Sequence, residues 1–209
     1  MSANSPLFSA EDFQDRTNVS RETLDHLRRY AALLEKWQKA INLVGNSTLP
    51  DLWRRHMLDS WQLLSCAGSK KGTWLDLGSG AGFPALVVAI ATDFDVHAVE
   101  SDQRKCLFMQ NVSRETLADL NVHRERIEAL PPFPADVISA RALAPLEKLL
   151  DYAAPFAHEG TEFLFLKGQD VDEELTNASK CWNMQVKKHR SLTSDDGCIV
   201  KLTAVSRLF

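Results

Sequence analysis

Apolar residues recur at helical spacing in the first third of the chain. After Ser20, a suitable N-cap, they follow one another at steps of three and four: Leu27, Tyr30, Leu34, Trp37, Ile41 and Val44. This spacing predicts one face of a long amphipathic helix, which Gly45 would end. A further helix is expected over residues 50–66. Residues 1–67 are therefore predicted to form an N-terminal helical cap in front of a core at residues 68–209.

From residue 73 onwards, short apolar runs alternate with helical patterns. Strands are expected at residues 74–77, 95–99, 121–127, 136–139, 161–166, 184–189 and 198–205. Helices are expected at residues 85–91, 103–120, 145–156 and from 170 onwards. This alternation predicts an α/β fold with a mainly parallel, seven-stranded sheet. The last two strands, joined by Asp196-Gly197, are expected to pair antiparallel.

Two details of the pattern give finer expectations. The third strand is more polar than the others, which places it near a sheet edge. In the helix at residues 103–120, the side chains expected to face inward are Leu107, Phe108, Val112 and Leu117.

Composition limits the classes of protein that fit. The chain has 209 residues, 44% of them hydrophobic, and a net charge of −4. No global basic field is present, so any contact with nucleic acid must rely on local patches. The four cysteines are scattered without zinc-ligand spacing, and residues 1–10 lack the apolar run of a secretion signal. With no stretch long enough to span a membrane, a cytoplasmic protein is expected.

A glycine-rich turn follows the strand at residues 74–77. Gly78, Gly80 and Gly82 stand at alternate positions after Asp76, and a proline then opens an apolar helix. A strand, a glycine turn and a helix N-terminus together bring bare backbone N–H groups up to a ligand. Glu100 ends the next strand, where a carboxylate can accept both hydroxyls of a ribose.

The glycine spacing separates two classes of cofactor. Dinucleotide-binding proteins carry G-x-G-x-x-G, whereas this chain has D-x-G-x-G-x-G. That form resembles motif I of the S-adenosylmethionine-dependent methyltransferases. The resemblance implies a Rossmann-like class I fold with S-adenosylmethionine as cofactor. The three glycines would let the backbone approach its methionine part. Phe83 packs either against the cofactor or in the core.

Other strand ends supply further candidates, because ligands bind at the carboxyl ends of parallel strands. Ile127 and Glu128 end the third predicted strand, where a main-chain group and a carboxylate can read the adenine amine. A plain surface glutamate explains Glu128 nearly as well. Arg141 follows the fourth strand and is expected to orient the substrate base or bind the cofactor carboxylate, unless it forms a structural ion pair.

The loop after the fourth strand restricts the chemistry. Methyltransferases that act on amino groups usually carry Asn-Pro-Pro-Tyr or Asp-Pro-Pro-Tyr there, whereas this chain has Ser139-Ala140-Arg141-Ala142. Carbon methylation needs a cysteine nucleophile, and Cys106 lies inside a predicted helix. A nucleophile with its own lone pair, such as a ring nitrogen, remains, and catalysis would then rest on alignment and exclusion of water.

Several motifs together resemble the GidB/RsmG family, ribosomal RNA small-subunit methyltransferase G. They are Ile41-Asn42-Leu43, residues 53–60 (WRRHMLDS), residues 76–84 (DLGSGAGFP), Ser139–Ala142 with Pro145-Leu146, and Leu166-Lys167-Gly168. The resemblance covers nearly the whole chain. The sequence departs from it at Val44, often threonine in the family, and at Ala85, commonly glycine.

The resemblance implies methyl transfer to the N7 atom of one guanine in 16S ribosomal RNA, within the small ribosomal subunit. It maps cofactor contacts onto Gly78, Phe83, Ile127, Glu128 and Arg141. No metal ion is expected, and the protein is expected to act as a monomer.

RNA binding requires a local cluster of basic side chains. The candidates near the predicted cleft are Arg55, His56, Arg104, Arg126 and Lys167. Two have simpler explanations. Arg55 can pair with Asp59, one helical turn away, and His56 can be a buried structural histidine.

Two other functions fit parts of the sequence. A non-catalytic ribosome-assembly factor could retain the methyltransferase fold, and would bind ribosomes without transferring methyl groups. A nicotinamide-dependent oxidoreductase is disfavoured by the displaced third glycine. A methyltransferase acting on a small molecule or a protein also stays open.

Overall fold

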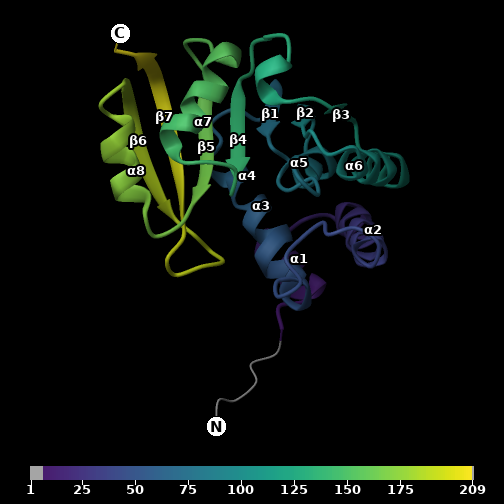
Figure 1. Ribbon diagram of the computed structural model, residues 1–209. Coiled ribbons are helices and arrows are strands. Elements are labelled where there is room, and N and C mark those ends of the chain that lie inside the picture. Colours follow the sequence, from purple (N-terminus) through teal and green to yellow (C-terminus); the bar gives the residue numbers. More distant parts are fainter. Residues whose placement is uncertain (1–6, 209) are drawn as a thin grey trace.

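The computed structural model describes residues 7–208 and contains one seven-stranded sheet with helices on both faces (Figure 1). The strands are β1 (Thr73–Leu77), β2 (Asp95–Val99), β3 (Leu120–His123), β4 (Val137–Arg141), β5 (Glu162–Lys167), β6 (Trp182–Arg190) and β7 (Cys198–Arg207). They lie in the order β3-β2-β1-β4-β5-β7-β6. The first five are parallel and β7 is antiparallel to both neighbours. The predicted sheet, the edge position of the third strand and the terminal antiparallel pair are confirmed.

Each face of the sheet is covered by its own helices. They are α5 (Ala85–Ala91), α6 (Gln103–Thr116), α7 (Leu146–Ala153) and α8 (Val171–Ala178), with single turns at Ile127–Ala129 (η3) and Ala154–Phe156 (η4). Side chains alternate along a strand, so Trp74 joins the cluster under α5 and α6 while Leu75 joins the cluster under α7 and α8.

The N-terminal third lies against the α5–α6 face. Its elements are α1 (Ala10–Thr17), α2 (Arg21–Gln38), η1 (Leu49–Asp51), η2 (Trp53–Leu58), α3 (Asp59–Trp61) and α4 (Leu63–Cys66). Tyr30 and Leu34 of α2 are fully buried in the same apolar cluster as Leu86 and Phe108. We call residues 7–67 the cap. That the cap is a domain separate from the core stays a prediction.

The predicted long helix is shorter than expected. It ends at Gln38, and Ile41 and Val44 lie in the following loop. The Gln38 side chain hydrogen-bonds to the backbone where a further helical turn was expected. Its Oε1 accepts hydrogen bonds from the N–H groups of Leu43 (2.9 Å) and Val44 (3.1 Å), and its Nε2 donates to the Val44 carbonyl (2.8 Å). A single side chain thus satisfies the backbone of a loop that sequence spacing assigned to a helix.

The helix and strand after Glu100 also differ from expectation. Helix α6 ends at Thr116, because Leu117 adopts a left-handed conformation (φ 54°) and its N–H bonds to the Ser113 carbonyl. Leu117 is 86% exposed and Leu107 48% exposed, so both were wrongly expected to face inward, whereas Phe108 and Val112 are buried. The predicted third strand is also too long. It stops at His123, and Ile127 lies in the turn η3.

The predicted helix over residues 50–66 is helical but irregular. Between Trp53 and Leu58 the turns widen, and the Asp59 N–H reaches back five residues to the Arg54 carbonyl. Wide turns of this kind often occur at functional sites. None of the helices within residues 7–208 is both long and apolar enough to cross a membrane.

Candidate functional site

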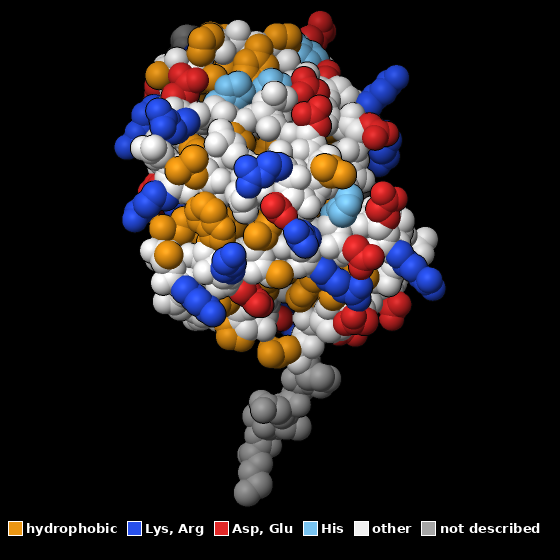
Figure 2. All heavy atoms as spheres, turned by 90° about the vertical axis from the view of Figure 1, so that its right-hand side faces the viewer, with side chains coloured by type: hydrophobic (Ala, Val, Ile, Leu, Met, Phe, Trp, Pro, Cys, Tyr) orange, Lys and Arg blue, Asp and Glu red, His pale blue; other side chains and the backbone are white. Residues whose placement is uncertain are grey.

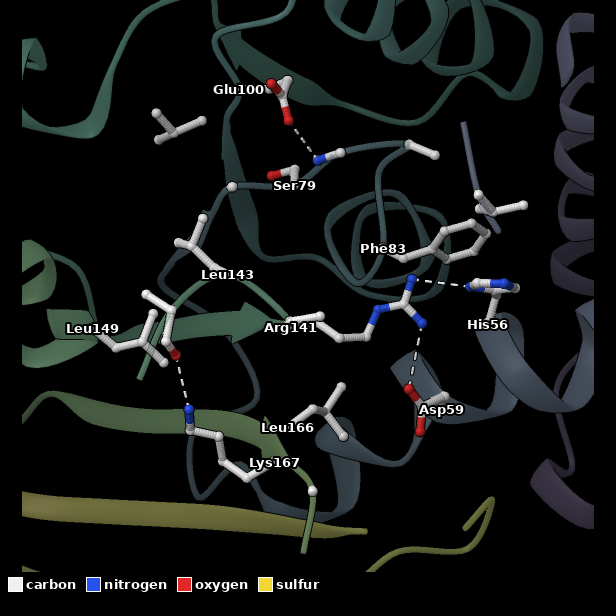
Figure 3. A pocket seen from close by; sticks show the side chains of 18 of the residues that line it. His56, Asp59, Ser79, Phe83, Glu100, Arg141, Leu143, Leu149, Leu166 and Lys167 are labelled. Carbon is white, nitrogen blue, oxygen red and sulfur yellow. Dashed lines mark hydrogen bonds and ion pairs between the residues drawn. The ribbon is translucent and has the colours of Figure 1, made fainter. Parts of the chain in front are cut away.

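A cleft of about 1050 Å³ opens between the cap and the carboxyl ends of the parallel strands (Figure 3). Most of the predicted site residues line it together: Gly78, Gly80, Phe83, Glu100, Ile127, Glu128, Arg141, Arg55, His56, Arg126 and Lys167. Gly82 and Arg104 are not part of its lining. The structure therefore brings together the cap and the carboxyl ends of the five parallel strands or the loops that follow them.

The glycine loop forms one wall of the cleft. Gly78 and Gly80 have φ angles of 68° and 59°, which side-chain-bearing residues rarely adopt. A Cβ at Gly78 would also lie 2.6 Å from Leu143 Cδ1. The Glu100 carboxylate holds the loop, because it accepts hydrogen bonds from the N–H groups of Gly80 (3.0 Å) and Asp102 (2.8 Å). The glycine loop is thus held in place, and at Gly78 and Gly80 its backbone lines the cleft without a side chain over it.

The end of the glycine loop is held by the cap. The Tyr30 hydroxyl donates to the buried Ala81 carbonyl (2.7 Å), and the Tyr30 ring stacks on Phe83 at 4.9 Å. Phe83 is 3% exposed yet lines the cleft, so it belongs to both the core and the site. Gly82 faces α5 instead, where a Cβ would collide with Leu86.

A buried carboxylate lies beneath the glycine loop. Asp76 Oδ1 accepts a hydrogen bond from Ser139 Oγ (2.7 Å), and Ser139 Oγ accepts one from Trp74 Nε1 (2.8 Å). Asp76 Oδ2 is buried without a hydrogen-bond partner in the described part of the chain. Burial raises the pKa of Asp76 to about 6. The Ser139 hydroxyl is therefore committed to Asp76 and is not available to a substrate.

Arg141 ends β4 and reaches into the cap (Figure 3). Its NH1 donates to the Arg55 carbonyl (3.1 Å) and to Asp59 Oδ2 (3.4 Å), and its NH2 donates to His56 Nδ1 (3.0 Å). The guanidinium lies 5.2 Å from the centre of the Phe83 ring. The side chain is 19% exposed. Asp59 thus pairs with Arg141, and the pairing with Arg55 considered from the sequence is not formed.

His56 lies between Arg141 and the loop after α2. His56 is only 7% exposed. Its Nε2 lies 2.7 Å from Thr48 Oγ1, and the Thr48 hydroxyl donates to the Gly45 carbonyl (2.8 Å). Burial, reinforced by the nearby positive charge of Arg141, lowers the pKa of His56 to about 3. His56 is therefore a neutral, hydrogen-bonded residue of the cleft wall.

The loop between β6 and β7 closes the cleft on the cap side. Asp59 Oδ1 accepts hydrogen bonds from Thr193 Oγ1 (2.5 Å) and Gln62 Nε2 (2.9 Å), and Gln62 Oε1 accepts one from the Leu192 N–H (2.8 Å). Thr193 and Gln62 were not among the residues predicted from the sequence. Nothing in the local pattern relates them, because they lie about 130 residues apart and meet only through the fold.

The basic residues predicted to bind RNA differ in their exposure and in their ion pairs. Arg55 and Arg126 are exposed at the cleft. The Lys167 side chain is only 8% exposed and pairs with Glu174 (2.5 Å). Arg104 is exposed beside Asp102 (3.6 Å). On the face drawn in Figure 2, basic and acidic side chains are interspersed. This face therefore offers no uniformly basic surface.

Within residues 7–208, no three histidine, cysteine or acidic side chains gather in a way that could hold a metal ion. The polar groups that line the cleft include the glycine-loop backbone, the Glu100 carboxylate and the Arg141 guanidinium.

Comparison with known proteins decides the family. The model of the family described as "GidB: rRNA small subunit methyltransferase G" matches residues 23–199. The chain belongs to the GidB family. Among curated members, the ribosomal RNA small subunit methyltransferase G of Paramagnetospirillum magneticum is 51% identical over 197 residues, covering 94% of this chain and 96% of that protein. The protein of the same name from Parvibaculum lavamentivorans is 50% identical over 208 residues, covering 97% and 92%.

Solved structures support the fold class of this GidB-family chain. The crystal structure of a putative S-adenosylmethionine-dependent methyltransferase from Methanococcus maripaludis superposes with a TM-score of 0.57 at 13% identity, covering 97% of this chain and 96% of that one. The predicted family and the Rossmann-like methyltransferase fold are both confirmed.

Proposed function

We propose that this protein transfers a methyl group from S-adenosylmethionine to the N7 atom of one guanine in 16S ribosomal RNA. Membership of the GidB family over residues 23–199 carries the proposal, and the cleft supports it. The proposal includes action on RNA within the small ribosomal subunit, by a cytoplasmic monomer.

The residues of the cleft fit the cofactor. Gly78 and Gly80 present backbone that a side chain would cover or distort, and Phe83 lines the same cleft. We assign the cofactor ribose to Glu100 and the cofactor α-carboxylate to Arg141. Ile127 and Glu128, at the end of the cleft nearest β3, are assigned to the adenine. When bound, S-adenosylmethionine supplies an electrophilic methyl group on a positively charged sulfur.

The histidine and the cysteines at or near the cleft are poorly suited to act as base or nucleophile for other methyl acceptors. Cys198 lines the cleft, and burial raises the pKa of its thiol. His56 is buried and bonded at both nitrogens. Cys106 donates from Sγ to the Glu100 carbonyl (3.1 Å), and burial raises the pKa of its thiol to about 11. A thiolate nucleophile for carbon methylation is therefore disfavoured. Guanine N7 has a free lone pair and needs no deprotonation, so the role of the protein is to align the base and exclude water.

Exposed basic residues at the cleft are assigned to the RNA backbone. Arg55 on the cap and Arg126 after β3 line the cleft from different elements. Phosphate contacts position an RNA without reading its sequence. We assign Arg104 to the outer rim. Lys167 is assigned to shaping the cleft through Glu174 and through its hydrogen bond to the Ala144 carbonyl (2.8 Å).

Labelled methyl transfer tests the proposal. Small ribosomal subunits lacking the modification are incubated with the protein and methyl-labelled S-adenosylmethionine, beside naked 16S RNA and ribosomal proteins. Label on a single guanine, lost in Gly80→Val, is expected because a branched side chain would cover the loop backbone. Cofactor binding without label on any of these substrates would instead favour a non-catalytic assembly factor. Binding of a nicotinamide cofactor, seen by its fluorescence, would overturn the cofactor assignment.

A further inference from the structure

The two ring nitrogens of His56 have fixed roles. A guanidinium carries only donors, so His56 Nδ1 must accept the hydrogen bond from Arg141 NH2 (3.0 Å). The proton of the neutral ring is then on Nε2, which donates to Thr48 Oγ1 (2.7 Å), and Thr48 donates onward to the Gly45 carbonyl (2.8 Å). This chain of bonds has one direction, from Arg141 through His56 into the backbone of the cap.

His56 is suited to hold Arg141 and unsuited to touch RNA. Both nitrogens are occupied and the residue is 7% exposed. The low pKa of His56 keeps the ring neutral, so it can accept from Arg141 instead of repelling it. The ring also lies against Phe83, with centroids 5.0 Å apart. His56 therefore contacts both the glycine loop and the guanidinium.

Arg141 keeps donors for a ligand. Of its five N–H groups, three bond to the cap. The other two have no hydrogen-bond partner among the described residues. Since Arg141 lines the cleft with 19% of its side chain exposed, a carboxylate in the cleft can take these donors. The cap contacts fix where the guanidinium sits.

We infer that His56 is a positioning residue, which holds the Arg141 guanidinium in place for the α-carboxylate of the cofactor. The inference rests on the proposed function. It makes the cap part of the cofactor site, and it assigns His56 to Arg141 in place of the direct RNA contact that was one of two interpretations of this residue from the sequence.

Two amide substitutions separate the two ends of the histidine ring. In His56→Asn the amide lies at the distance of Nδ1 from the backbone, so its oxygen can accept from Arg141. In His56→Gln the amide lies at the distance of Nε2, so it can reach Thr48 but leaves Arg141 without this acceptor. His56→Leu removes both. Thermal unfolding and circular dichroism of all three variants report whether each is folded.

Calorimetry with two ligands gives the decisive readout. S-adenosylhomocysteine carries the α-carboxylate, and 5′-methylthioadenosine lacks the whole amino-acid part. The Kd for S-adenosylhomocysteine is expected to rise about tenfold in His56→Gln and His56→Leu, because one charged hydrogen bond from Arg141 to the cofactor carboxylate is misplaced. In His56→Asn this Kd is expected to stay within about threefold. The Kd for 5′-methylthioadenosine is expected to change by less than about twofold in all three.

The outcomes distinguish this inference from the proposed function. Failure of the wild-type protein to bind S-adenosylhomocysteine would refute the proposed cofactor. If the wild type binds it and transfers methyl groups, two results would overturn the role of His56 alone. One is equal weakening of both ligands, which indicates general damage to the cleft. The other is equal Kd values for S-adenosylhomocysteine in the Asn and Gln variants.

Discussion

The two walls of the cleft are built in different ways. The glycine-loop wall, residues 78–83 with Glu100, comes from neighbouring strands and presents mainly backbone. The cap wall comprises His56, Asp59, Arg141 and Thr193, which come from three distant parts of the chain and meet through side chains. A backbone wall depends on which φ angles are allowed, whereas a side-chain wall depends on several hydrogen bonds, each of modest strength. Substitutions should therefore affect the two walls differently.

The largest effect is expected at Gly78, in the glycine-loop wall. Gly78→Val places a branched side chain at a φ angle of 68° and against Leu143. The Kd for S-adenosylhomocysteine should rise about 1000-fold or more in calorimetry. Gly160 is the control, because it lies outside the cleft lining and has no left-handed φ angle, and Gly160→Val should stay within about threefold. Similar affinities for the two variants would show that the loop conformation does not matter for binding.

Beneath the same wall, Asp76 should give the protein a pH-dependent stability. Its pKa is about 6 in the folded protein, against an ordinary value near 3.8 in the unfolded chain. Between about pH 4 and pH 6 the folded state holds the proton more tightly, so the free energy of unfolding falls as pH rises, by up to about 3 kcal/mol.

Asp76→Asn should abolish this contribution while keeping an oxygen for Ser139. Urea unfolding of both proteins from about pH 4 to pH 7 measures the difference. If the free energy of unfolding changed with pH in the same way for both proteins, the raised pKa of Asp76 would be contradicted.

An intermediate effect is expected where the cap meets the glycine loop. Tyr30→Phe keeps the ring on Phe83 and removes only the hydroxyl, which leaves the buried Ala81 carbonyl unpaired. The free energy of unfolding should fall by about 2 kcal/mol in urea titrations. The affinity for S-adenosylhomocysteine should fall as well, because the glycine loop loses the hydrogen bond that holds Ala81 in place. Unchanged affinity would indicate that stacking alone holds the loop.

In the cap wall, the hydrogen bonds of one hydroxyl should matter less. Thr193→Val removes the bond to Asp59 (2.5 Å) and the bond with Ser191 Oγ (3.0 Å) with little change in shape, and should cost about 1 kcal/mol of unfolding free energy. Thr203→Val is the control, because its bond to Gln185 is exposed and 3.4 Å long, and should cost less than about 0.5 kcal/mol. A loss at Thr193 as large as that at Tyr30 would remove the contrast between the walls.

The smallest effect is expected outside both walls. Arg29 of α2 and Glu115 of α6 form an ion pair between the cap and the core (2.5 Å), with side chains 59% and 32% exposed. Solvent and salt screen such pairs. Arg29→Gln should therefore unfold in urea like the wild type and keep its methyl-transfer rate. A clear loss of either would show that surface charge, and not the buried contacts, holds the cap.

The sequence predicted the glycine-loop wall better than the cap wall, for a physical reason. Asp76, the three glycines and Glu100 follow strands whose apolar runs are visible locally, and parallel strands bring their ends together. The bond between Gln62 and Leu192 crosses 130 residues and leaves no local signal. Arg141 was selected from its position after β4, but its partners in the cap could not be.

The errors in secondary structure have the same origin. Ile41 and Val44 continue the apolar spacing of α2, yet the Gln38 side chain bonds to the loop backbone and ends the helix. Leu117 continues the pattern of α6 but takes a left-handed conformation at its end. In both places tertiary or capping contacts override a periodic pattern.

The late position of the β6–β7 loop also has a consequence for synthesis. Thr193 lies 134 positions after Asp59 in the chain, and non-local contacts of this kind form slowly. During translation the glycine loop therefore emerges well before the opposite side of the cleft can be completed. The nascent chain therefore passes through a stage in which the glycine loop is already made and the cleft is not yet closed.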